Sequence, residues 1–138
     1  MKQFQKTLTI SCRDQGFNDF TREVNAAVRE GRVDGGLLTL FTQDIGCSLS
    51  IQEKNGPNAL HSKMEVLTGH SAQEAHTSKA DMSQIDLHDH TRMAMTSPSL
   101  SIPVQNGRAI LGSWQIICLY EHHSHAATRH VFFHLTGN

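Results

Sequence analysis

Apolar and polar residues alternate along several short stretches of the chain, and this pattern predicts β-strands. The clearest case is residues 47–53, where Cys47, Leu49 and Ile51 face one way while serines and a glutamine face the other. Shorter or longer runs of the same kind predict further strands at residues 3–10, 32–43, 100–104, 108–111, 113–121 and 128–135.

Helical spacing of apolar residues predicts two or three helices. Residues 17–30 form the first, and Gly31 provides its C-terminal stop. Two more are predicted at residues 57–67 and from 86 to about 95, on either side of a polar loop at 70–83. Because Asn106-Gly107 is a type I′ hairpin signal, we expect one α+β domain over residues 1–138, with a mostly antiparallel or mixed sheet against these helices.

The composition is that of an ordinary globular protein, and it narrows the function classes. Hydrophobic residues make up 38% of the 138 residues, charged residues 18%, and the net charge is -1. The chain has no excess of basic residues, so its composition does not predict a nucleic-acid partner. The chain shows no signal peptide and no long apolar run, so we expect a cytoplasmic protein without a membrane partner. Three cysteines without C-x-x-C spacing predict reduced core thiols.

The densest group of titratable residues is the run Asp-Leu-His-Asp-His at 86–90. If this run is helical, Asp86 and His90 share one face and form an acid/base pair or half of a metal site. A structural alternative is that Asp86 caps the helix and Asp89 completes a capping box. The local pattern alone favours this structural alternative.

Three predicted strands carry an acid at the end of an apolar stripe. These acids are Glu53, Glu121 and Asp44. An acid in that position can lie at the mouth of the core, partly desolvated, where it meets a metal or another titrating group. Alternatively, each stripe simply ends at water. The three together make the two interpretations about equally strong.

Ten histidines are many for this length, so their roles matter. His122, His123 and His125 crowd one turn, but their spacing lacks the helical regularity of a zinc-helix motif. His130 and His134 alternate with a phenylalanine on the last predicted strand and are more typical of surface or packed strand residues. Neither group by itself predicts a metal site.

The later segments resemble a known family. Residues 100–108 read Leu-Ser-Ile-Pro-Val-Gln-Asn-Gly-Arg, residues 111–115 read Leu-Gly-Ser-Trp-Gln, and Glu121 follows. This order, preceded by an aspartate and a histidine four residues apart, is similar to the YjbQ-like family, named secondary thiamine-phosphate synthases. The resemblance runs from about Phe4 to Leu135. It implies an α+β fold, a homotrimer and weak thiamine-phosphate synthase activity.

The resemblance also implies site residues. Asp86 and His90 match the suspected functional pair, and with Glu53 and Glu121 they form the expected catalytic set. The expected contacts to a small phosphorylated metabolite are Trp114, Gln115, Arg129, Asp44 and Ser48. Expected ligands of a divalent metal, Mg or Zn, are His90, Asp86 and His76.

One segment departs from the family pattern. The family usually reads His-Thr-Ser-Ala-Ser where this chain has Asp-Ile-Gly-Cys-Ser at residues 44–48. An aspartate in place of the histidine keeps a metal ligand but loses an imidazole proton shuttle. Two hypotheses therefore stand: a thiamine-phosphate synthase-like enzyme, or a non-catalytic trimer that binds a small anionic metabolite or a metal.

Overall fold

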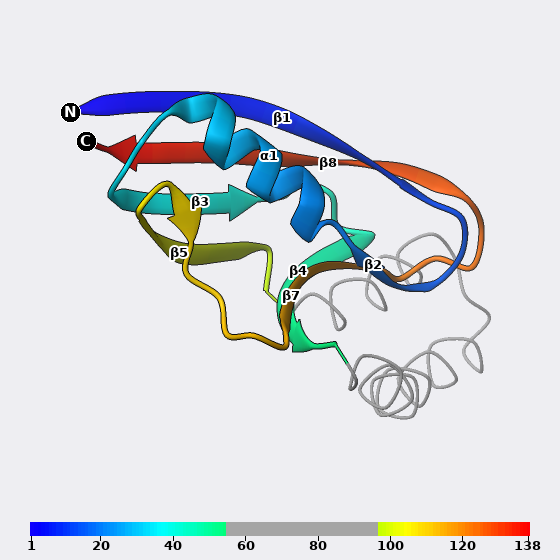
Figure 1. The fold of residues 1–138 in the computed structure, drawn as a ribbon. Coiled ribbons are helices and arrows are strands. Elements are labelled where there is room, and N and C mark those ends of the chain that lie inside the picture. The colour runs from blue at the N-terminus through cyan, green and yellow to red at the C-terminus, as the bar shows by residue number, and fades with distance from the viewer. Residues whose placement is uncertain (55–96) are drawn as a thin grey trace.

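The computed structural model describes residues 1–54 and 97–138, which form two antiparallel sheets and one helix (Figure 1). In chain order the elements are β1 (Lys2–Cys12), β2 (Gly16–Asp19), α1 (Thr21–Gly31), β3 (Gly36–Phe41), β4 (Cys47–Glu53), β5 (Ser99–Gln105), β6 (Arg108–Ala109), β7 (Gln115–Glu121) and β8 (Ala127–Gly137).

The larger sheet has five strands in the order β1-β8-β3-β5-β6. The first and last strands pair over their whole length, from Lys2 opposite Gly137 to Cys12 opposite Ala127, so the two termini lie side by side (Figure 1). Strand β8 is therefore flanked on both sides, by β1 and β3. Its alternate residues are buried, as the pleat of a strand with one covered face requires.

The smaller sheet has the order β2-β7-β4, with β7 in the centre. Its register places Cys47 opposite Glu121 at one end and Glu53 opposite Gln115 at the other. Within this sheet the prediction of a helix beginning at residue 17 is wrong. Residues 16–19 pair with β7, and the Phe17 ring packs edge-on against Tyr120 with centroids 4.8 Å apart. Cross-strand packing thus overrides the helical spacing of Phe17.

Helix α1 lies over one face of the larger sheet (Figure 1). The Asp19 carboxylate, two residues ahead, accepts hydrogen bonds from the Thr21 backbone N–H and hydroxyl. The helix buries Val24, Ala27 and Val28. The left-handed residue that ends it is Arg32 rather than the predicted Gly31, and the Arg32 N–H donates to the Arg29 carbonyl.

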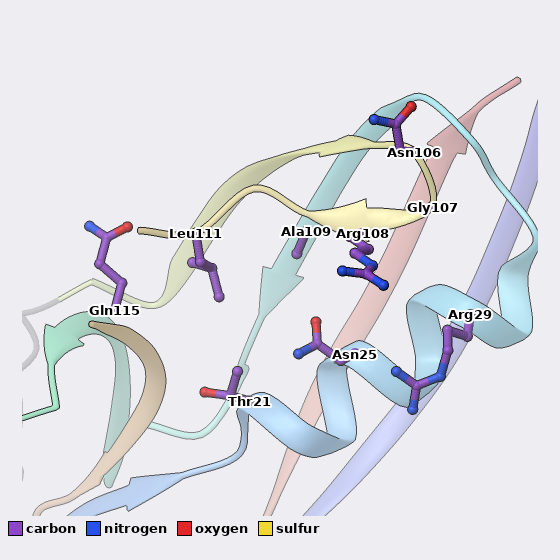
Figure 2. A pocket seen from close by; sticks show the side chains of 9 residues that line it. All are labelled: Thr21, Asn25, Arg29, Asn106, Gly107, Arg108, Ala109, Leu111 and Gln115. Atoms are coloured by element: carbon purple, nitrogen blue, oxygen red, sulfur yellow. The ribbon is translucent and has the colours of Figure 1, made fainter. Parts of the chain in front are cut away.

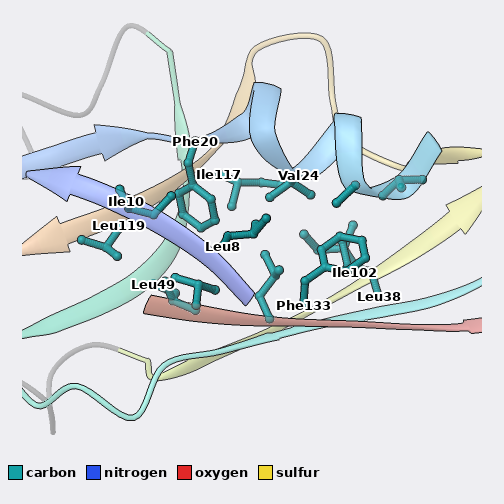
Figure 3. Close-up of a cluster of buried hydrophobic side chains, with 14 of the residues drawn as sticks. Leu8, Ile10, Phe20, Val24, Leu38, Leu49, Ile102, Ile117, Leu119 and Phe133 are labelled. Carbon is teal, nitrogen blue, oxygen red and sulfur yellow. The ribbon is translucent and has the colours of Figure 1, made fainter. Parts of the chain in front are cut away.

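The hydrophobic core fills the space between α1 and the two sheets (Figure 3). Its fully buried large side chains include Phe20, Leu38, Leu49, Leu119 and Phe133. Burying each such side chain contributes about 1.5 to 3 kcal/mol relative to leaving it exposed. This core fixes the face of each strand and therefore the position of every polar residue at the strand ends.

The α+β class and the mostly antiparallel sheet are confirmed, but the described residues contain one helix rather than two or three. The other predicted helices fall on residues 55–96, outside the described residues. The hairpin prediction is confirmed: Asn106 and Gly107 have φ values of 53° and 72°. In the part of the chain that the structure describes, no helix is long and apolar enough to cross a membrane.

We expect Gly36→Ala to destabilise the protein by about 2 to 3 kcal/mol. A Cβ at Gly36 would overlap the Thr136 carbonyl oxygen and lie 2.8 Å from the Gly137 Cα, so two strands would have to separate. The matched control is Gly35→Ala, whose Cβ would meet nothing closer than the Val104 carbonyl oxygen at 4.0 Å. Urea unfolding should show a loss for the first variant and a change within about 0.5 kcal/mol for the second. Equal stabilities would contradict the close β3–β8 approach.

Candidate functional site

Polar residues gather at the end of the smaller sheet where β4 begins and β7 ends. We call this group the buried polar corner and define it as Asp44, Ser48, Glu121, His122 and Arg129. Glu121, Ser48 and His122 are fully buried although they lie next to the apolar core. Of the three acids predicted at strand ends, only Glu121 is buried at the mouth of the core.

An ion pair between Glu121 and Arg129 forms the centre of the corner. Arg129 Nε donates to Glu121 Oε2 at 2.7 Å, and Nη2 donates to Oε1 at 2.7 Å. The His123 backbone N–H donates to Oε1 as well, at 3.1 Å. The carboxylate side chain is 0% exposed and the guanidinium side chain 16%. Hydrogen bonding to this carboxylate raises the pKa of Arg129, so the group stays charged at every physiological pH.

Gly46 makes room for the arginine. A Cβ at this position would overlap Arg129 Nη2 and lie 2.7 Å from the His123 ring. Arg129 Nη2 also donates to the Gly46 carbonyl oxygen at 3.5 Å. The segment that departs from the family pattern is thus fitted closely around the guanidinium.

Asp44 and Ser48 are both tied to neighbouring groups in the corner. The Asp44 carboxylate accepts the His130 backbone N–H at 3.3 Å, while its own N–H donates to the buried Thr42 hydroxyl at 3.2 Å. Ser48 Oγ lies 3.2 Å from His122 Nε2. The alternation of β4 places Ser48 away from the core, yet it is buried and lies against the equally buried His122.

Two thiols border the ion pair. Burial raises the pKa of Cys12 to about 11, and the nearby negative charge of Glu121 adds to this shift. Burial likewise raises the pKa of Cys47 to about 11. Both thiols are therefore neutral at physiological pH and are not nucleophiles. The predicted reduced core thiols are confirmed, since Cys12, Cys47 and Cys118 are all free and buried.

The remaining described site candidates lie at the opposite end of the smaller sheet. Glu53 is paired with Gln115, and the Lys54 N–H donates to the Trp114 carbonyl at 2.7 Å. Glu53 lies six residues after Cys47 in β4, which corresponds to roughly 20 Å along an extended strand. Glu53 is exposed, and so is Trp114 at 64%. Within one chain the predicted site residues that the structure describes therefore form two groups.

The central pair of the prediction lies outside the part of the chain that the structure describes. Asp86, His90 and the third expected metal ligand, His76, lie outside the described residues. Over residues 1–54 and 97–138, no three His, Cys, Asp or Glu side chains are arranged to hold a metal ion. The catalytic and metal assignments of these three residues stay predictions.

A groove of about 590 Å³ was not predicted from the sequence (Figure 2). It lies between α1 and the β5–β6 hairpin, and Gln115 is the one predicted site residue among the described residues that line it. Its lining residues are Thr21, Asn25, Arg29, Asn106, Gly107, Arg108, Ala109, Leu111 and Gln115. The sequence signal for its helical side is the polar series Thr21, Asn25 and Arg29, which repeats every four residues on one face of α1.

Solved structures share this architecture. A YbjQ-like protein of unknown function from Sulfolobus solfataricus P2 superposes with a TM-score of 0.82 at 19% identity, covering 99% of each chain. A conserved hypothetical protein from Thermus thermophilus superposes with a TM-score of 0.75 at 25% identity, covering 93% of this chain and 97% of that one. The first likeness, at this low identity, shows the fold alone.

Sequence comparisons give closer relatives. The chain is 33% identical over 139 residues to the UPF0047 protein YjbQ of Escherichia coli O157:H7, covering 97% of this chain and 98% of the relative. It is 30% identical over 137 residues to a UPF0047 protein of Synechocystis sp., covering 99% and 93%. The family model described as UPF0047 protein YjbQ-like matches residues 6–138. Because both its fold and its sequence match these relatives, the chain belongs to the YjbQ-like UPF0047 family.

Proposed function

We propose that this protein binds a small phosphorylated metabolite at the buried polar corner and catalyses a thiamine-phosphate synthase-like transfer there. The observation that supports this proposal best is the guanidinium of Arg129, held in a fixed orientation by a fully buried carboxylate. A planar, permanently charged donor in a fixed position is the group proteins favour for phosphate.

The energetics of the pair favour a functional role over a purely stabilising one. A buried ion pair adds little net stability compared with well-packed apolar residues, because removing both charges from water costs several kcal/mol per ion. Here the pair ends the apolar stripe of Ile117 and Leu119, where a further apolar residue would extend the core. In the part of the chain that the structure describes, Arg129 Nη1 makes no hydrogen bond to the carboxylate and remains available for a ligand.

The proposed reaction needs an anion site of this kind. The nitrogen of a thiazole phosphate attacks the methylene carbon of a pyrimidine diphosphate, a C–N bond forms, and the C–O bond to pyrophosphate breaks. The pyrophosphate leaves with the bonding electron pair, so its growing negative charge must be stabilised. Arg129 supplies one positive charge, and a divalent metal bound on the carboxylates would supply more. Asp86 and His90 complete the site in this proposal.

A homotrimer would bring the two groups of site residues together. Because Glu53, Trp114 and Gln115 lie at the far end of β4 and β7, we place the pocket at a subunit boundary. The surface proposed for this contact is the face of the larger sheet opposite α1. Phe41 and Phe132 form a cross-strand pair there and are 41% and 48% exposed. An aromatic pair on an open sheet face is typical of a protein interface, and we assign a second copy of this chain to it.

The non-catalytic alternative has one observation in its favour. Asp44 occupies the place of the family histidine, and its carboxylate is engaged by the His130 backbone N–H. The position therefore lacks the imidazole that could serve as a proton shuttle. A protein that binds the same anion without turnover is therefore the second candidate function.

We expect pyrimidine diphosphate, thiazole phosphate and magnesium to give measurable thiamine phosphate, detected after oxidation to its fluorescent derivative. Asp86→Ala and His90→Ala should each reduce the rate at least 100-fold, and omission of magnesium should do the same. Arg129→Lys should raise the KM, because lysine keeps the charge but loses the bidentate geometry. Arg22→Gln, on the exposed side of α1, is the matched control and should leave the rate unchanged.

Activity that survives both Asp86→Ala and His90→Ala would discard the enzyme assignment. Binding of thiazole phosphate or pyrophosphate without any product would instead support the non-catalytic candidate. Circular dichroism of each variant separates a lost activity from a lost fold.

Sedimentation equilibrium should give three times the mass of one chain. The substitutions Phe41→Ser and Phe132→Ser together should shift the protein toward the monomer, because they remove the apolar pair from the proposed contact. Ile110→Ser is the control: it removes a side chain of similar exposure, 50%, that lies outside β3 and β8. A wild-type protein with the mass of one chain would contradict the trimer.

A further inference from the structure

We propose that the groove between α1 and the β5–β6 hairpin is a second anion site, separate from the buried polar corner, for a small phosphate-bearing metabolite. We call it the arginine groove and define it by Thr21, Asn25, Arg29, Arg108 and Gln115 (Figure 2). It goes beyond the function proposed above, and it depends on none of the residues of the corner.

The helical side of the groove follows from the amphipathic pattern of α1. Thr21, Asn25 and Arg29 are spaced four residues apart and lie along one face of the helix, while Val24 and Val28 are buried on another. The Thr21 hydroxyl is already used, since it donates to Asp19 and accepts the Ile117 N–H at 2.8 Å. Asn25 and Arg29 are thus the helical groups available to a ligand.

The hairpin supplies the second arginine. Its turn at Asn106-Gly107 is held to the body of the protein by the Gly107 N–H, which donates to the Asp34 carbonyl at 2.9 Å. Arg108 follows immediately, and Figure 2 shows its side chain pointing toward Asn25 across the groove. A rigid turn therefore places this guanidinium opposite the helix, at low cost in conformational entropy when a ligand binds.

The charge of the groove favours an anion. Among the described residues, its lining contains two arginines and no acidic residue. Within residues 1–54 and 97–138, neither guanidinium takes part in an ion pair or a side-chain hydrogen bond. Of the neighbouring acids, Asp19 bonds Thr21, and Asp34 lines an adjoining hollow that Arg29 also borders, without forming an ion pair with it. Two guanidinium groups that are engaged in no ion pair among the described residues are a suitable site for phosphate.

The rest of the lining indicates the size and polarity of the ligand. A volume of about 590 Å³ is in the range of small-molecule sites. Gln115 Oε1 accepts the Gly112 N–H at 2.7 Å, which fixes the side chain and leaves its amide nitrogen as a donor. Leu111 and Ala109 provide a small apolar wall. A phosphate or diphosphate joined to a compact polar body fits this lining.

The position of the groove separates it from the corner. Gln115 begins β7 and Glu121 ends it, so the two sites lie at opposite ends of one strand. A ligand in the groove would contact α1 and the hairpin, neither of which contributes a residue to the corner. Within one chain the two sites share no residue, so substitution of Arg29 and Arg108 tests the groove while substitution of Arg129 tests the corner.

The test is isothermal titration calorimetry with inorganic pyrophosphate, on a chain carrying Asp86→Ala and His90→Ala so that turnover is absent. Quenching or enhancement of Trp114, the only tryptophan and the residue before Gln115, provides a second readout. Arg29→Gln and Arg108→Gln should each weaken pyrophosphate binding at least 10-fold. Together they should abolish the binding heat that comes from the groove. Inorganic phosphate should bind more weakly than pyrophosphate, because it engages one guanidinium instead of two.

The matched control is Arg22→Gln, which removes an exposed arginine from the same helix but outside the groove lining. Its pyrophosphate affinity should stay within twofold of the parent. Arg129→Lys should also leave the groove's binding in place, and this result separates the groove from the corner. Binding that is unchanged in the Arg29→Gln/Arg108→Gln chain, or no binding of pyrophosphate at millimolar concentration, would overturn the proposal.

Discussion

The ion pair between Glu121 and Arg129 is the constraint that determines the arrangement of the described site. It joins the end of β7 to β8 through two hydrogen bonds of 2.7 Å, one from Nε and one from Nη2. A carboxylate with no exposed surface must keep this partner, because an unpaired buried charge is strongly destabilising. The surrounding backbone follows from this requirement: Gly46 has no side chain because the guanidinium occupies that space.

The same sheet that positions the pair also separates it from the other predicted site residues. Strand β7 runs from Gln115 beside the arginine groove to Glu121 in the corner. One end is open and rich in amide and guanidinium donors, while the other is closed and carries paired charges. The two ends of β7 are therefore different chemical environments within the described part of the chain.

Much of the fold could be predicted from local pattern, and less of the site. Strand β4 and the Asn106-Gly107 hairpin follow from alternation and turn chemistry, which depend on neighbours in sequence. The prediction for Phe17 is wrong because its partner, Tyr120, is distant in sequence. The same limit applies to the site: the contact between Ser48 and His122, like the groove between Arg29 and Arg108, depends on tertiary packing that periodicity does not contain.

A double-mutant cycle on the ion pair is the decisive measurement, with the free energy of unfolding determined for the parent, Glu121→Leu, Arg129→Met and the double variant. We predict that Glu121→Leu, which removes the carboxylate from a mostly buried guanidinium, costs about 3 kcal/mol, and that Arg129→Met costs about 3 to 5 kcal/mol. The double variant should recover most of that loss, because apolar side chains of similar volume replace both charges. Two losses that simply add in the double variant would show that the carboxylate and the guanidinium are not coupled, and would contradict the central role of the pair.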